Sequence, residues 1–178
     1  MRGCACRGTS GFVHVSCLAE QAKILFAEVE ENNLGAKAKN ARWRRWSTCS
    51  LCEQKYHGVV QCALGWASWK TYVGRPETHE LRINAMKQLG CGLSAAGYHE
   101  EALTVREAKL SMLRRLGASE EYILNAQGNI ANTYQVLGRH EDALHLKRDV
   151  YSGCLKLNGE EDKPPSQQPC AARRPFLI

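Results

Sequence analysis

The cysteines of this chain fall into closely spaced pairs near its N-terminus. Of the nine, six precede residue 75, and one of them follows a histidine by three residues. Two such ligands separated by one or two residues can hold an ion from a single tight turn, and zinc takes about four in a tetrahedron. The spacing therefore predicts three candidate half-sites, with buried structural thiols as the alternative: Cys4 with Cys6, His14 with Cys17, and Cys49 with Cys52.

The N-terminal residues, the cysteine count and the apolar stretches indicate the compartment of the protein. Met1-Arg2-Gly3-Cys4 lacks the apolar core of a secretory signal. An odd cysteine count without such a signal argues against a disulfide scaffold. Apolar stretches are far shorter than a membrane span requires. We therefore expect a soluble, intracellular protein, cytoplasmic or nuclear, whose thiols stay reduced.

Charge divides the chain into two parts. The net charge is +6, and residues 1–75 hold 11 basic against 5 acidic side chains, whereas the later residues balance. Within the basic part, Arg42-Trp43-Arg44-Arg45-Trp46 interleaves guanidinium groups with indoles. This stretch predicts either stacking on nucleic-acid bases or tryptophans packed inward beneath solvated arginines. The packing interpretation is favoured because the cluster is short and isolated.

The segment from Cys4 to Tyr56 resembles the RING-CH (RING-variant) zinc finger of ubiquitin ligases. The pattern is Cys-x-Cys-x-Gly-Thr-x-x-Phe-Val-His-x-x-Cys-Leu, followed by Cys-x-x-Cys-x-x-x-Tyr. The resemblance implies one complete zinc site and half of a second in a cross-brace. The complete site comprises Cys4, Cys6, Cys49 and Cys52, and His14 with Cys17 forms the half-site, which His57 and Cys62 are candidates to complete.

Two elements depart from that family. Its first Cys-x-x-Cys pair would precede Met1, so we expect a shortened chain that lacks part of the surface for a ubiquitin-conjugating enzyme. The stretch between Cys17 and Cys49 is also long, and apolar spacing predicts a helix over 17–31 within it.

A further helix is predicted over 58–73, with Trp66 and Trp69 on its buried face.

An internal repeat dominates the second half. Residues 97–103 and 138–144 match at five of seven positions with an offset of 41. The pattern predicts helices over 79–95, 99–116, 120–136 and 140–157. Around Tyr134 the sequence resembles the tetratricopeptide repeat (TPR), with a period similar to kinesin light chains. The resemblance implies a protein or peptide partner on the concave face, where the candidates are Asn125, Asn129, Asn132 and Gln135.

The predicted fold is mainly α, with a small zinc-bound RING-like module followed by a TPR-like solenoid. Its parts are residues 1–57, the partial finger; 58–78, a connecting helix and linker; 79–162, two repeats; and 163–178, an irregular proline-rich tail that leaves the array cut short.

No motif of a hydrolase or nucleotide-binding enzyme is found. The sequence therefore predicts a zinc-binding protein-interaction adaptor and assigns no catalytic residue. A ubiquitin-protein ligase that selects substrates through its repeats, with a ubiquitin-conjugating enzyme as partner, is the alternative. A nucleic-acid-binding zinc protein is the weaker one.

Overall fold

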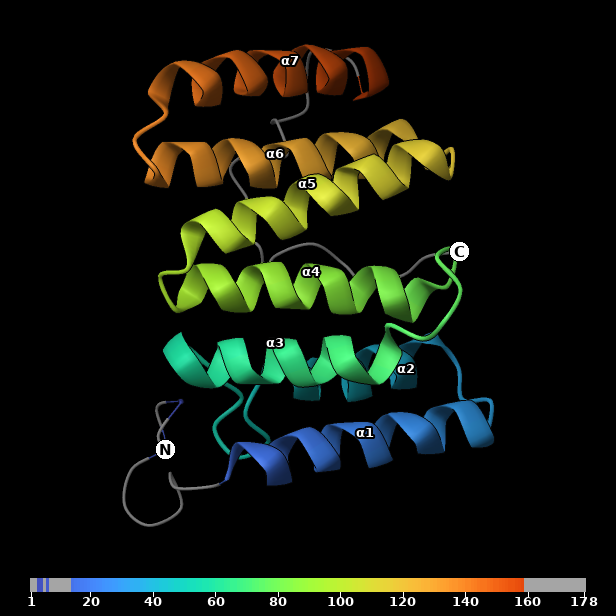
Figure 1. Cartoon of the computed structure of the whole chain (residues 1–178). Coiled ribbons are helices and arrows are strands. Elements are labelled where there is room, and N and C mark those ends of the chain that lie inside the picture. The colour runs from blue at the N-terminus through green and yellow to red at the C-terminus, as the bar shows by residue number, and fades with distance from the viewer. Residues whose placement is uncertain (1–2, 5, 7–13, 159–178) are drawn as a thin grey trace. The chain divides into compact units, whose positions relative to one another are not determined.

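The computed structural model describes residues 3, 4, 6 and 14–158, and these are mainly helical (Figure 1). The predicted tail at 163–178 lies outside the described residues. Contacts divide the described chain into two compact units, one ending at Gly97 and one beginning at Tyr98. The first holds α1 (Val15–Glu31), α2 (Ala36–Trp43), the 3-10 helix η2 (Arg44–Trp46), α3 (Gly58–Tyr72) and α4 (Glu80–Ala95). The second holds α5 (His99–Arg115), α6 (Glu120–Val136) and α7 (His140–Asn158).

Apolar spacing located the long helices correctly. The expected helices over 17–31, 58–73, 79–95, 99–116, 120–136 and 140–157 correspond to α1 and α3–α7 within two residues at each end. Helix α2 was not anticipated. The boundary after Gly97 falls inside the first predicted repeat, so α4 packs with α3 in the first unit. An array of two TPR-like repeats over 79–162 stays a prediction.

Four aromatic rings tie the helices of the first unit together. Trp43 lies 5.5 Å from both Phe26 of α1 and Tyr72 of α3, measured between ring centroids. Trp46 lies 6.5 Å from Trp43 and is fully buried. Edge-on and tilted pairs at these spacings are favourable beyond the apolar area they bury. The packing interpretation of the Trp-Arg stretch is therefore confirmed for Trp46, whose ring is not available to stack on a base.

The arginines of the same stretch find carboxylates on the surface of the first unit. Arg45 pairs with Glu53 at 3.0 Å, and Arg42 approaches Glu28 at 3.6 Å. Both pairs are partly exposed, so each stabilises the fold only weakly. Their effect is to neutralise part of the basic cluster that the sequence suggested for nucleic acid.

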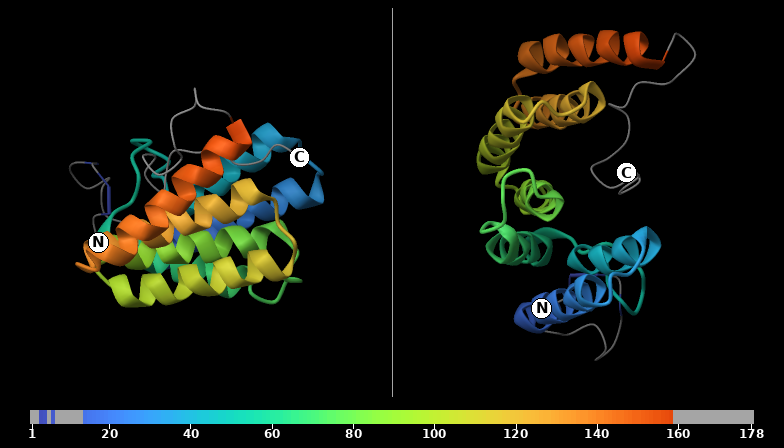
Figure 2. Two further views of the ribbon diagram at one scale, coloured as in Figure 1. Left: turned by 90° about the horizontal axis from the view of Figure 1, so that it is seen from above. Right: turned by 90° about the vertical axis from the view of Figure 1, so that its right-hand side faces the viewer.

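Helices α3 and α4 lie side by side at unusually short range (Figure 2). A Cβ atom on Gly92 of α4 would lie 2.7 Å from the carbonyl oxygen of Gln61 and 2.9 Å from the Cα of Cys62. Gly65 of α3 is nearly as tight against Gln88, at 3.0 Å. Glycine at these two positions is what lets the backbones approach. The expectation that Trp66 is buried was wrong, because this side chain is 44% exposed, whereas Trp69 packs at the margin of the core.

Helix α6 is the centre of the second unit, between α5 and α7 (Figure 2). Ala131 of α6 and Ala143 of α7 are buried, as expected for small residues at a close helix crossing. Gly153 adds a contact that the sequence did not indicate, since a Cβ atom there would lie 2.6 Å from the Leu124 side chain. Small residues therefore set the helix spacing in this unit too.

Replacing Gly92 with alanine should destabilise the first unit by about 1–3 kcal/mol, because the added methyl meets backbone atoms that cannot rotate away. All four tryptophans lie in the first unit, so tryptophan fluorescence during urea denaturation measures this loss. Gly74→Ala in the same unit is the matched control, since a Cβ atom there meets nothing within 4 Å. It should leave the transition within about 0.5 kcal/mol of the wild type. Equal shifts of the fluorescence transition in both variants would contradict the close α3–α4 contact.

Candidate metal centre

The turn that carries Cys49 and Cys52 lies between η2 and α3, and backbone hydrogen bonds within the turn hold its shape. The amide of Cys49 donates to the carbonyl oxygen of Gln54 at 2.9 Å, and the amide of Glu53 donates back to Cys49 at 3.1 Å. Glu53 adopts a left-handed conformation with φ of 54°, which closes the turn. Thr48 and Lys55 form an isolated antiparallel bridge. The two cysteines are thus fixed on a short hairpin-like knuckle.

Gly3 brings the first two cysteines to this knuckle. Its carbonyl oxygen accepts a hydrogen bond from the amide of His57 at 2.9 Å. A Cβ atom on Gly3 would lie 2.5 Å from the Cβ of Val60 at the start of α3, so a larger residue does not fit. Sequence reasoning did not single out Gly3; a small residue directly before Cys-x-Cys was its only signal.

The sulfur atoms of Cys4, Cys6, Cys49 and Cys52 all lie within 4.8 Å of one another. The Sγ atoms of Cys6 and Cys49 are 3.7 Å apart. A tetrahedral zinc-thiolate site with Zn–S bonds of about 2.3 Å has S–S edges of about 3.8 Å. The cluster therefore has the size of a four-thiolate metal site, with at most a modest contraction needed on its longer edges. These are the four ligands that the RING-CH resemblance grouped together.

The thiols of the cluster perturb one another. Hydrogen-bonding contacts with Cys52 and Cys4 raise the pKa of Cys6 to about 12, and burial raises the pKa of Cys4. Burial also disfavours the Cys49 thiolate, but the amides of Cys52 and Leu51 outweigh it and lower that pKa to about 7. The amide of Leu51 lies 3.4 Å from the Cys49 sulfur. The turn is thus prepared to hold negative charge on sulfur at Cys49.

Tyr56 lies next to the cysteine cluster, with Arg45 close to it. Tyr56 is 4% exposed, and its burial together with the neighbouring Cys49 and Cys4 raises the pKa of its hydroxyl. Arg45, paired with Glu53, lies near enough to Tyr56 to influence its titration. A buried phenol and a cation beside a thiolate cluster are groups that can moderate its charge.

The predicted half-site is not part of this cluster. Among the described residues, the group able to hold a metal comprises the four cysteines alone. His14 caps the N-terminus of α1 and is exposed, and Cys17 in the first turn of α1 is exposed as well. His57 precedes α3, and Cys62 is buried within that helix. None of these four residues is brought to the cluster.

The side chains predicted to bind a peptide are largely occupied within the second unit. The amide group of Asn129 donates to the carbonyl oxygen of Asn125 at 2.9 Å and to its side-chain oxygen at 3.2 Å. Gln135 accepts a hydrogen bond from Lys147. Asn132 is half-buried on α6. These contacts give the residues a structural role in α6, and a peptide would have to compete with it.

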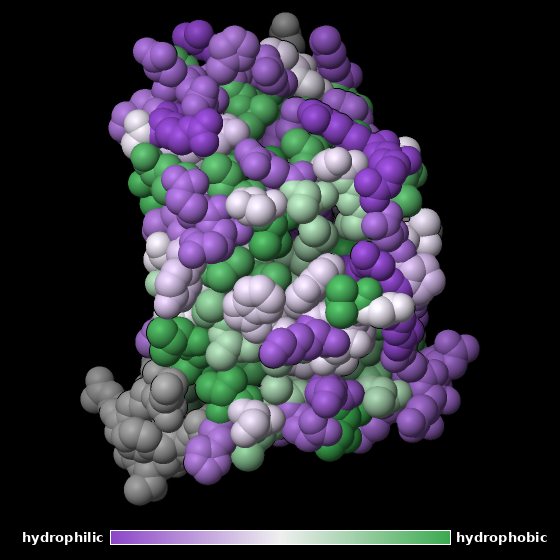
Figure 3. All heavy atoms as spheres, viewed as in Figure 1, coloured by the Kyte–Doolittle hydropathy of each residue, from purple (hydrophilic) through white to green (hydrophobic). Residues whose placement is uncertain are grey.

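Comparisons with protein-family models, with curated proteins and with solved structures found no match to this chain. No helix among the described residues is long and apolar enough to cross a membrane. The face seen in Figure 3 mixes hydrophilic with hydrophobic side chains.

Metal binding at this centre should weaken steeply in acid. The raised pKa values of Cys4 and Cys6 keep both thiols protonated at neutral pH, and a metal must displace both protons because thiolates are the ligands. With Zn2+ as the probe ion, the apparent Kd should rise at least about 100-fold for each unit of pH lost between pH 8 and 6, since any proton displaced from Cys49 or Cys52 adds to these two. Competition with a chromophoric chelator measures this. A pH-independent Kd would contradict thiolate ligation.

Proposed function

We propose that this chain is a zinc-binding protein-interaction adaptor in which zinc has a structural role. The observation that carries the proposal is the cluster of four cysteine sulfur atoms within 4.8 Å. Thiolates are soft ligands that favour zinc among abundant divalent ions. Four of them fill a tetrahedron and leave no open position for a reactive water. A centre of this kind stabilises a fold and does not catalyse a reaction.

The location of the centre supports the structural role. It joins residues 3, 4 and 6 to the turn at 47–57, and these residues have no regular secondary structure of their own. All four cysteines pack against the core cluster that contains Trp46 and Tyr56. Zinc would therefore stabilise an otherwise weakly connected end of the first unit, by about 10 kcal/mol in comparable small sites.

The adaptor role assigns partner binding to the helical part of the chain. It rests on the TPR resemblance of residues 79–162 and on the packing of α5–α7, in which small residues hold the helices close together. Helical scaffolds of this type present side chains from neighbouring helices to a peptide. The partner of the adaptor is a protein or peptide.

Purified reduced protein should contain about one zinc per chain. Cys49→Ser should remove it and lower the midpoint of the fluorescence-detected unfolding transition, because the site loses one of four ligands. Cys17→Ser is the matched control, since Cys17 is exposed on α1 and lies outside the cluster. It should leave both values unchanged. Elemental analysis gives the stoichiometry, and zinc-free wild-type protein with an unchanged fold would refute the proposal.

A ubiquitin-protein ligase is the second candidate, and one surface feature favours it. Leu51 lies between Cys49 and Cys52 and is 69% exposed. In the RING-type ligases that this segment resembles, an apolar residue inside the first ligand pair contacts the ubiquitin-conjugating enzyme, whereas Leu51 lies inside the last pair. An exposed leucine on a metal-held knuckle offers a contact of the same chemistry.

The ligase candidate predicts autoubiquitination with at least one enzyme of a conjugating-enzyme panel. Leu51→Ala should reduce that activity at least about ten-fold, the loss of one central apolar contact at an interface, while zinc content stays at the wild-type value. Val59→Ala on α3 is the matched control, because Val59 is also exposed, and it should leave the activity unchanged. Absence of activity across the panel would leave the adaptor role alone.

A further inference from the structure

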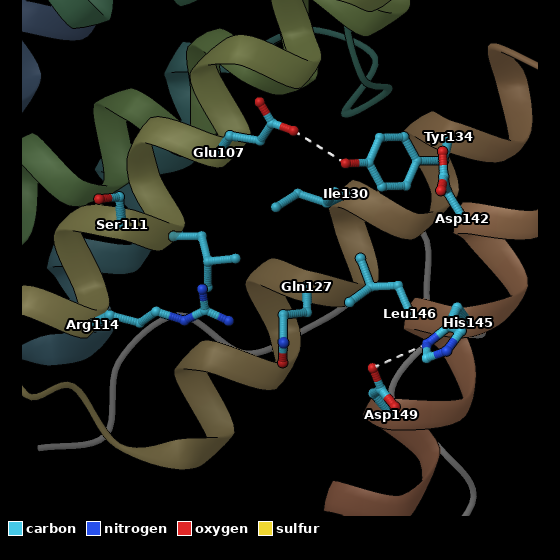
Figure 4. Close-up of a pocket in the computed structure, with 11 residues that line it drawn as sticks. Glu107, Ser111, Arg114, Gln127, Ile130, Tyr134, Asp142, His145, Leu146 and Asp149 are labelled. Carbon is cyan, nitrogen blue, oxygen red and sulfur yellow. Dashed lines mark hydrogen bonds and ion pairs between the residues drawn. The ribbon is translucent and has the colours of Figure 1, made fainter. Parts of the chain in front are cut away.

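The second unit contains a groove that the sequence did not predict. It has a volume of about 500 Å³ and runs between α5 and α7 over α6 (Figure 4). The apolar part consists of Leu110, Ile130 and Leu146, of which the first two are buried as a floor. The helical repeat places Ile130 and its neighbour Tyr134 on the opposite face of α6 from Asn125, Asn129 and Asn132. The groove is thus distinct from the face on which a peptide was expected.

Carboxylates stand at both ends of this apolar floor. Glu107 and Asp142 lie at the end near Tyr134, whose hydroxyl donates to Glu107 at 3.1 Å (Figure 4). Asp149 lies toward the other end, 3.6 Å from the ring of the exposed His145. Arg114 also lines the groove. Asp142 is already paired with Arg139 at 2.9 Å. Two carboxylates, Glu107 and Asp149, therefore stand against the one permanent cation among the lining residues, and the groove favours an occupant that carries basic and apolar side chains together.

We infer that this groove is the docking site of the chain's own segment Arg173–Ile178. That segment reads Arg-Arg-Pro-Phe-Leu-Ile, two guanidinium groups followed by three large apolar side chains. The guanidinium groups match the carboxylates at the rim of the groove, and the apolar residues match its floor. The inference does not depend on the metal centre, because every lining residue belongs to α5–α7.

The length of chain between the groove and this segment permits the docking. Asp149 lies about 14 Å along α7 from Asn158, given a rise of about 1.5 Å per residue. The chain between Asn158 and Arg173 spans up to about 50 Å when extended. Tethering of this kind gives an effective concentration on the order of millimolar, so a weak contact suffices to keep the groove filled. A docked segment would keep other basic peptides out of the groove until they displace it.

Trypsin offers a direct test on the full chain. In the segment 163–178 it can cut efficiently only after Arg173, since Lys163 and Arg174 are each followed by proline. Docking shields this bond, so Leu146→Asp, which places a charge in the groove, should speed release of the fragment 174–178 by about five-fold. Leu144→Asp is the matched control, because Leu144 lies on the same helix, is 51% exposed and does not line the groove. Mass spectrometry measures the release, and circular dichroism confirms that both variants keep their helices.

Charge reversal provides a second, independent variant. Asp142→Lys combined with Asp149→Lys should also speed release, and Arg173→Lys, which keeps the charge and the trypsin site, should not. Equal release rates for wild type, Leu146→Asp and the charge-reversed variant would overturn the inference. Protection that disappears on dilution would overturn it as well, since it would show that the groove takes a segment from a second copy.

Discussion

Four sulfur atoms within 4.8 Å of one another form the arrangement on which the N-terminal end of this molecule depends. The described residues of the segments that bring them together form no regular helix or sheet, and a backbone hydrogen bond from His57 to Gly3 links these segments. Without a metal, Cys4 and Cys6 are protonated at neutral pH because their pKa values are raised. A bound metal would displace these protons and form four bonds to sulfur, while the same cysteines pack against Trp46 and Tyr56. Metal binding would therefore be coupled to burial of the aromatic core.

The long helices were predictable because they leave a periodic apolar pattern in the sequence. Spacing indicated the cysteine pairs, and the RING-CH resemblance implied that four of these cysteines share one site. Helix α2 was not predictable in this way, since its sequence Ala-Lys-Ala-Lys-Asn-Ala-Arg-Trp has no large apolar residue before Trp43. It packs mainly through Trp43 at its end. The burial of Trp66 was predicted wrongly for a related reason. The face of α3 that meets α4 is marked by Gly65, because close backbone approach needs a small residue there.

Contacts with other residues of the chain determine which of the suggested functional side chains remain available to bind a ligand. The tryptophans of the basic stretch are drawn into the aromatic core, and Arg45 is held by Glu53. On α6, the side chain of Asn129 bonds back to Asn125. A linear pattern gives the type of a side chain and its face, and it says nothing about a partner supplied by another helix. The His14 and Cys17 pair, predicted as half of a second site, belongs to no group of three or more metal ligands among the described residues.

The two units obtain their stability from different sources, and this difference bears on how the protein responds to its surroundings. The first unit combines an aromatic core with a thiol cluster that could hold a metal, so chelation and oxidation would act on it. The described second unit is held by helix packing through small residues such as Ala131 and Gly153, which chelation does not affect. A partner-binding surface on α5–α7 would therefore persist when the metal is lost. Metal loss would then affect what the first unit contributes and leave the binding function of the second unit in place.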